Sequence, residues 1–131
     1  MPLLMQQILS TQDVDINKGV HYVFLDNDKR QPVSQGAVFL SRHKRGIGLR
    51  MKKAPGDERG AYWTDDEFDI NRIKVKEDIG SVENLLRENK VVVIVKSDLD
   101  ECREDKLLEF CPRSYKYFRK SLASCLRIYG T

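Results

Sequence analysis

Six cations gathered in one short stretch are the side chains of this chain best suited to chemistry. Residues 41–53 read SRHKRGIGLRMKK and contain no acidic residue. The cations are Arg42, Lys44, Arg45, Arg50, Lys52 and Lys53. Lysine and arginine can neutralise phosphates, so the stretch predicts contact with nucleic acid. The same cations could instead bind an acidic patch on another protein. A purely structural alternative is that they protect an edge strand from aggregation.

Acidic side chains gather in a second segment, which reads TDDEFD. Its acids are Asp65, Asp66, Glu67 and Asp69. In a metal-dependent nuclease, converging carboxylates would bind Mg²⁺ and Lys74 would lie beside the attacking water. No acid lies two residues before Lys74 or Lys76, however, which departs from that arrangement. We therefore interpret the segment as a helix N-terminus capped by Thr64, with its acids at the favourable end of the helix dipole.

The remaining residues that could do chemistry form no catalytic or cofactor-binding motif. His21 and His43 have no serine or cysteine nearby in a nucleophile motif, and the sequence contains no glycine-rich phosphate loop. The spacing of Cys102, Cys111 and Cys125 matches neither a zinc site nor a disulfide framework, so we expect reduced thiols. These observations predict a protein that is not an enzyme, with no metal, cofactor or nucleotide ligand.

The overall composition is that of one soluble domain. Of 131 residues, 40% are apolar and 33% are charged, and the formal net charge is +3. We expect a single domain over residues 1–131, β-rich over 1–79 and α/β or helical over 80–131. The sequence has neither a signal-peptide pattern nor a run of about 18 apolar residues, which predicts a cytoplasmic protein without a membrane partner.

The cations of the first half are expected on strands. Residues 20–25 and 37–40 are β-prone, and residues 47–52 alternate apolar with polar side chains. The last two runs would form a hairpin with the basic residues 42–46 at its tip. Residues 72–76 alternate as well, which would place Arg72 and Lys74 on the exposed face of a further strand.

The second half is expected to supply a central strand and two helices. VVVIV at 91–95 is typical of a strand buried on both faces, Asp98 can cap a helix, and Pro112 can open another. The order of elements predicts an α+β fold, with a largely antiparallel sheet or small barrel followed by two C-terminal helices. Trp63 follows a loop and precedes acids, which makes it the best candidate for an exposed aromatic residue.

The last helix is expected to have an apolar stripe beside a basic one. At about 100° per residue, one arc collects the side chains of Tyr115, Phe118, Leu122, Cys125, Leu126 and Tyr129. The neighbouring arc collects Arg113, Lys116, Arg119, Lys120 and Arg127. No acid occurs from residue 110 to the end, so these cations lack the i,i+4 partners of an ordinary salt-bridged face.

Together these patterns predict a small non-catalytic module that binds nucleic acid through a basic hairpin and a basic helix face. The predicted contact residues are Arg42, Lys44, Arg45, Arg50, Lys52, Lys53, Arg72, Lys74, Lys116, Arg119, Lys120 and Arg127. We further expect the hairpin and the helix to form one continuous basic surface. A regulatory adaptor that binds an acidic partner protein is the alternative, and a metal-dependent nuclease is the third hypothesis.

Overall fold

A computed structural model describes residues 3–6, 18–32, 35–95 and 102–130. Its strands are β1 (Leu3–Gln6), β2 (Val20–Asn27), β3 (Gly46–Lys52) and β4 (Val91–Val95). The helices are α2 (Gln35–Ser41), α3 (Phe68–Arg87), α5 (Glu104–Phe110) and α6 (Pro112–Tyr129), with short 3-10 turns at Arg59–Ala61 and Asp65–Glu67. Asp98, the predicted helix cap, lies outside the described residues.

The strands form one four-stranded sheet in the order β1-β4-β2-β3, and every neighbouring pair is parallel. The α+β character of the prediction is confirmed, whereas the predicted antiparallel sheet or small barrel is wrong. Parallel neighbours need a crossover connection rather than a tight turn. Residues 28–45, which contain α2, link β2 to β3, and residues 53–90, which contain α3, link β3 to β4.

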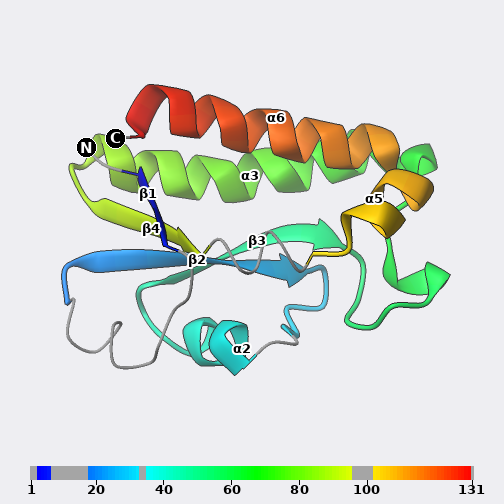
Figure 1. The fold of residues 1–131 in the computed structure, drawn as a ribbon, viewed down its shortest axis with the longest axis horizontal. Helices are drawn as coiled ribbons and strands as arrows, with labels where there is room; N and C mark the ends of the chain where they lie inside the picture. Colours follow the sequence, from blue (N-terminus) through cyan, green and yellow to red (C-terminus); the bar gives the residue numbers. More distant parts are fainter. Residues whose placement is uncertain (1–2, 7–17, 33–34, 96–101, 131) are drawn as a thin grey trace.

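Helices cover both faces of this sheet (Figure 1). On one face, α3 and α6 lie side by side and pack on the larger core, which includes Val23, Leu49 and Ile94 of the sheet. On the other face, Ala37 and Leu40 of α2 pack in a smaller cluster with Tyr22, Phe24 and Val93. The prediction of a central strand at 91–95 is confirmed, because β4 lies between β1 and β2 and its residues 92–94 are buried.

The predicted hairpin is wrong because residues 37–40 belong to a helix. In α2, Ala37 and Leu40 are three residues apart, so both side chains reach the sheet from one helix face. Gly46 is the first residue of β3 and lies against the backbone of Leu40, near the end of this helix. A Cβ atom there would lie 2.0 Å from the carbonyl oxygen of Leu40, so the close approach of α2 to β3 requires glycine.

Residues 72–76 are also helical, which overturns the strand predicted there. The buried positions of α3 follow helical spacing and are Asn71, Val75, Asp78, Ile79, Val82 and Leu86. Two of them are polar, while Ile70 and Ile73 are 52% and 53% exposed. Of the two apolar residues whose alternation predicted a strand, Val75 is buried and Ile73 is exposed, so the two do not share one face.

The predicted stripe of α6 is confirmed. Its buried apolar side chains, which pack against α3 and the sheet, are Tyr115, Phe118, Leu122 and Cys125. The first residue of α6 is Pro112, as predicted. Asp65 caps this helix from a distant segment by accepting hydrogen bonds from the backbone amides of residues 113 and 114, at 3.0 and 3.1 Å. The cap predicted at Thr64 is wrong, because its side chain accepts no capping hydrogen bond from a backbone amide of the described residues. None of the described helices is both long enough and apolar enough to cross a membrane.

Replacing Ile94 with Asp should remove at least about 4 kcal/mol from the free energy of unfolding, because the carboxylate would be buried in β4 without a partner. Ile94 is only 2% exposed. Ile73→Asp is the matched control, since the same substitution at an exposed helix position should cost about 1 kcal/mol or less. Urea denaturation followed by circular dichroism measures both values. Similar losses in the two variants would contradict the central position of β4.

Candidate functional site

The six cations of residues 41–53 are divided between the two ends of the sheet. Arg42 and Lys44 are exposed in the connection between α2 and β3, at the amino ends of the strands. Arg45 is partly buried and donates to the carbonyl oxygen of Val20 at 2.8 Å. Arg50, Lys52 and Lys53 lie at or beyond the carboxyl end of β3, and each has a partner. The stretch therefore does not act as a single basic finger.

A buried carboxylate holds the carboxyl half of β3 against α3. Asp78 of α3 is 7% exposed and accepts three hydrogen bonds from Arg50, from the backbone amide at 2.8 Å and from Nε and Nη2 at 2.9 and 3.1 Å. Hydrogen bonding to Asp78 raises the pKa of Arg50. Because the amide of Arg50 belongs to an edge strand, Asp78 also satisfies a donor that would otherwise be open to another chain.

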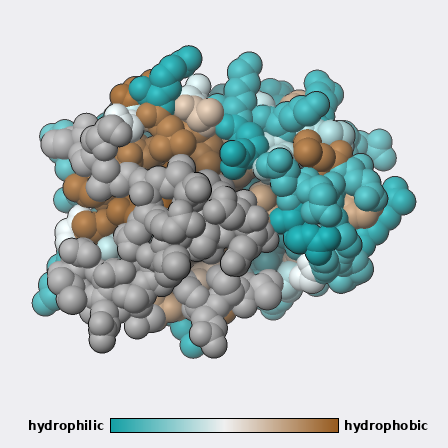
Figure 2. All heavy atoms as spheres, in the orientation of Figure 1, coloured by the Kyte–Doolittle hydropathy of each residue, from teal (hydrophilic) through white to brown (hydrophobic). Residues whose placement is uncertain are grey.

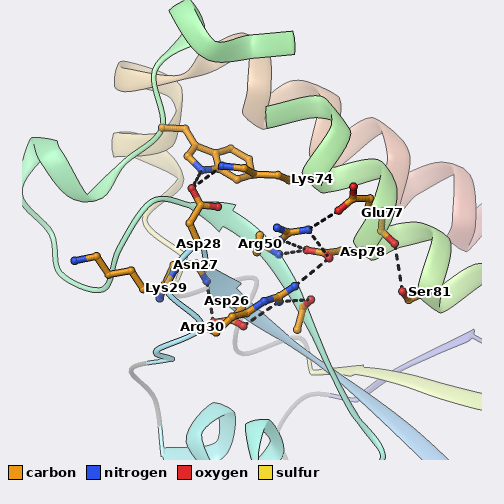
Figure 3. Close-up of polar contacts among 12 residues, drawn as sticks. Asp26, Asn27, Asp28, Lys29, Arg30, Arg50, Lys74, Glu77, Asp78 and Ser81 are labelled. Carbon is orange, nitrogen blue, oxygen red and sulfur yellow. Dashed lines mark hydrogen bonds and ion pairs between the residues drawn. The ribbon is translucent and has the colours of Figure 1, made fainter. Parts of the chain in front are cut away.

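Arg30 joins the same carboxylate to β2. Its guanidinium donates to Asp26 at 3.1 Å, to the carbonyl oxygen of Gly48 at 3.0 Å and to Asp78 at 3.2 Å (Figure 3). Gly48 leaves room for this contact, since a Cβ atom there would lie 2.7 Å from the Asp26 carboxylate. The backbone of Arg30 is left-handed, with φ of 54°, a conformation that is costly for a residue with a side chain. The three contacts compensate for that cost.

A third acid, Asp28, adds contacts toward the loop that precedes α3. Its Oδ2 accepts hydrogen bonds from Nε1 of Trp63 at 3.0 Å and from Nζ of Lys74 at 2.8 Å. Oδ1 of Asp28 is buried without a hydrogen-bond partner among the described residues. Trp63 is only 3% exposed, so the prediction of an exposed aromatic residue at this position is wrong.

We name these residues the carboxyl-edge network, because they lie where the parallel strands β2 and β3 end. The network consists of Asp26, Asp28, Arg30, Arg50, Lys74 and Asp78. Three carboxylates face three cations, so its formal charges cancel. The predicted strand ended at residue 25, so the network was not predicted. The missed signal was the run of three polar residues, 26–28, directly after an apolar strand. We interpret the network as a fastening between sheet and helix, since each of its cations already has a carboxylate partner.

The other two cations that the basic stretch contributes to this edge, Lys52 and Lys53, have partners too. Lys52 donates to the carbonyl oxygen of Gly56 at 2.5 Å and lies 4.3 Å from the ring centroid of Tyr62. Burial lowers the pKa of Lys52. Lys53 lies 3.7 Å from a carboxylate oxygen of Glu67, and both side chains are about half exposed. Lys52 and Lys53 are therefore already engaged by described residues and are not free for a polyanion.

The acidic segment and the thiols are likewise engaged in structure. Asp65 caps α6, and Asp69 forms an ion pair with Arg72 at 3.4 Å. The described residues contain no group of three His, Cys, Asp or Glu side chains that could hold a metal ion. Burial raises the pKa of both Cys111 and Cys125 to about 12, which is unfavourable for a thiolate nucleophile. All three cysteines are free thiols.

The predicted basic face of α6 remains together and exposed. We name Arg113, Lys116, Lys120 and Arg127 the α6 row. At about 100° per residue they lie within about 60° of one another, opposite the buried Phe118 and Leu122. At about 1.5 Å per residue the row is about 21 Å long. Arg119 is also exposed and flanks it.

Among the residues that the structure describes, the cations of the α6 row have no carboxylate partner. Among the described residues, no ion pair involves Lys116, Lys120 or Arg127, whereas the charged groups of the carboxyl-edge network are paired. Figure 2 shows hydrophilic side chains projecting from the part of the molecule where Figure 1 places α6. The row is therefore the strongest candidate for an interface with an anionic partner.

The structure separates most of the other predicted contact residues from this row, with Arg72 as the exception. Arg72 lies on α3 beside α6, but Lys74 points to the opposite side, where it binds Asp28. Residues 42–45 follow α2, which covers the face of the sheet opposite to α6 (Figure 1). The row and the basic stretch of the first half thus lie in different layers of the molecule.

Comparison with known proteins assigns the chain to a family without a known activity. Residues 4–121 match a family described as a family of unknown function, DUF7831, and the chain belongs to that family. No curated protein and no solved structure matches it. Its function must therefore be argued from the surface that the fold presents.

Replacing Asp78 with Asn should lower the free energy of unfolding by about 3 kcal/mol, because Arg50 would lose its buried counter-charge. Glu77→Gln is the control, since Glu77 contacts the same guanidinium at 3.1 Å from a side chain that is 64% exposed. We expect a loss below about 1 kcal/mol for that variant. Urea titration of both proteins measures the difference. Equal losses would show that the buried pair does not fasten α3 to the sheet.

Proposed function

We propose that the protein is a non-catalytic module that binds nucleic acid through the α6 row. The observation that carries the proposal is a straight line of exposed cations, opposite the core, in a helix that contains no acidic residue. A polyanion that neutralises such cations releases its own condensed counterions, which favours binding. The row offers charge rather than hydrogen-bonding patterns, so we expect binding to be independent of sequence.

Stability alone does not explain the row. A cation in the last turn of a helix is stabilised by the helix dipole, which accounts for Arg127. Lys116 and Lys120 lie in the interior of α6, beyond the reach of that effect. Long lysine stems can cover apolar surface, but these two side chains are exposed and point away from the core. Contact with an anionic partner gives these positions a role.

A pair of charge reversals tests the proposal. Lys116→Glu together with Lys120→Glu should weaken binding of a fluorescent oligonucleotide at least about tenfold at low salt. Arg42→Glu with Lys44→Glu is the matched control, because it changes the net charge equally at another exposed site. We expect the control to bind nearly as tightly as the wild type. Anisotropy titrations on single strands and duplexes give both affinities.

The salt dependence gives an independent measure of the same contacts. If the four cations of the row each meet one phosphate, the logarithm of the affinity should fall with the logarithm of salt with a slope of about −2.8 on single strands. Reversal of Lys116 and Lys120 should reduce the slope to about −1.4. Equal effects of both double variants would mean that net charge, not the row, controls binding.

The same assay distinguishes the competing functions. An intact oligonucleotide after incubation with Mg²⁺ agrees with a non-catalytic module, whereas cleavage would favour the nuclease hypothesis. If no nucleic acid binds at low salt, the proposal fails. The regulatory adaptor, with the row docked on an acidic protein, would then be the better explanation.

A further inference from the structure

An aromatic pair lies between α3 and α6 beside the α6 row. Phe68 begins α3, and its ring meets that of Tyr117 on α6 edge to face, with centroids 6.1 Å apart and an interplanar angle of 89°. Both side chains are partly exposed. The guanidinium of Arg113 lies 3.9 Å from the ring centroid of Phe68, so a member of the row is already in contact with the pair.

Cations flank this pair on both helices. On α6, Tyr117 lies four residues after Arg113 and three before Lys120, so both cations neighbour it on the helix surface. On α3, Phe68 is followed at i+4 and i+8 by Arg72 and Lys76, which therefore share its side of the helix. Both of these cations are exposed; Arg72 also forms an ion pair with Asp69, whereas Lys76 has no carboxylate partner among the described residues. The pair thus lies between two sets of positive charge.

Aromatic rings and cations interleaved in this way suit an unpaired nucleic-acid strand. A base has a flat face that can stack on an aromatic ring or an arginine plane, and this contact tolerates any sequence. In a duplex, those faces are covered by neighbouring base pairs. A duplex can therefore use the α6 row but cannot use Tyr117.

We propose that the protein binds single-stranded nucleic acid, with one base stacked on the Phe68–Tyr117 pair and the phosphates along the α6 row. This inference rests on the proposed function and adds the class of ligand. The acidic residues that precede and follow Phe68, including the exposed Asp66 and Asp69, repel phosphates at that end. A strand that covers the row from Arg113 to Arg127 therefore extends further at the Arg127 end, away from the acidic segment.

Comparison of a normal strand with an abasic one tests the stacking without any mutation. A labelled single strand of about twelve thymidines and an abasic strand with the same number of phosphates carry equal charge. We expect wild-type protein to bind the thymidine strand about 5-fold to 100-fold more tightly, which corresponds to one stacked base. A uridine strand provides the RNA arm. Equal affinities for abasic and base-bearing strands would overturn the inference.

Variants at Tyr117 locate the stacked base. Tyr117→Ala should abolish most of the preference for bases while leaving both the salt slope and the affinity for the abasic strand unchanged. Tyr117→Phe is the control and should retain the preference, because it keeps the ring. Thermal unfolding of each variant reports whether the fold persists. An equal loss of affinity for both strands in a folded Tyr117→Ala protein would contradict stacking.

The two proposals fail in different ways. If both strands bind equally and the double reversal at Lys116 and Lys120 still weakens them, the single-strand inference is wrong and nucleic-acid binding stands. If neither the single strands nor a duplex binds at low salt, the proposed function itself is wrong.

Discussion

The buried carboxylate of Asp78 is the contact on which the arrangement of this fold depends most. It accepts hydrogen bonds from Arg50 of β3 and from Arg30 beyond β2, and so fixes α3 over the edge of the sheet. That position allows the chain to return from edge strand β3 to β4, in the interior of the sheet, as a parallel crossover. α6 then packs on α3, where Asn71 and Ser114 form a buried hydrogen bond of 3.0 Å. The Arg50–Asp78 pair thus positions α3, and α3 in turn determines which face of α6 is exposed.

The same contact determines which cations are available to a partner. Removing one member of a buried pair leaves its partner charged and desolvated, so Arg50 cannot leave Asp78 without a cost of a few kcal/mol. A phosphate would have to compensate for that loss before it gained any affinity. Lys116 and Lys120 carry no such cost, because they are exposed and unpaired among the described residues. A cation with a buried carboxylate partner serves the structure, whereas an exposed cation without such a partner can bind a phosphate. The local density of positive charge does not distinguish the two kinds.

Sequence reasoning succeeded where one periodicity was unbroken. It failed in the short apolar run 37–40, which is too short to tell a helix from a strand, and in α3, where polar residues are buried. The strands at 20–25, 47–52 and 91–95 and the two faces of α6 all have clear patterns and were predicted. In α3, Asn71 and Asp78 occupy the buried stripe, so its alternation resembled a strand, and without that helix the sheet was taken to be antiparallel. The α6 row could be predicted, because its residues follow helical spacing within one segment. The carboxyl-edge network joins residues far apart in the sequence, and only the parallel topology brings them together.

The acidic segment before α3 gives the α6 surface a direction. Asp65 satisfies the first amides of α6, and this contact brings its acidic neighbours close to the start of the helix. Asp66 is exposed there, whereas the far end of the row at Arg127 has no acidic neighbour within α6. A polyanion is therefore repelled near Phe68 and attracted along the rest of the helix. The carboxylate that allows α6 to begin thereby also limits where a bound strand can extend.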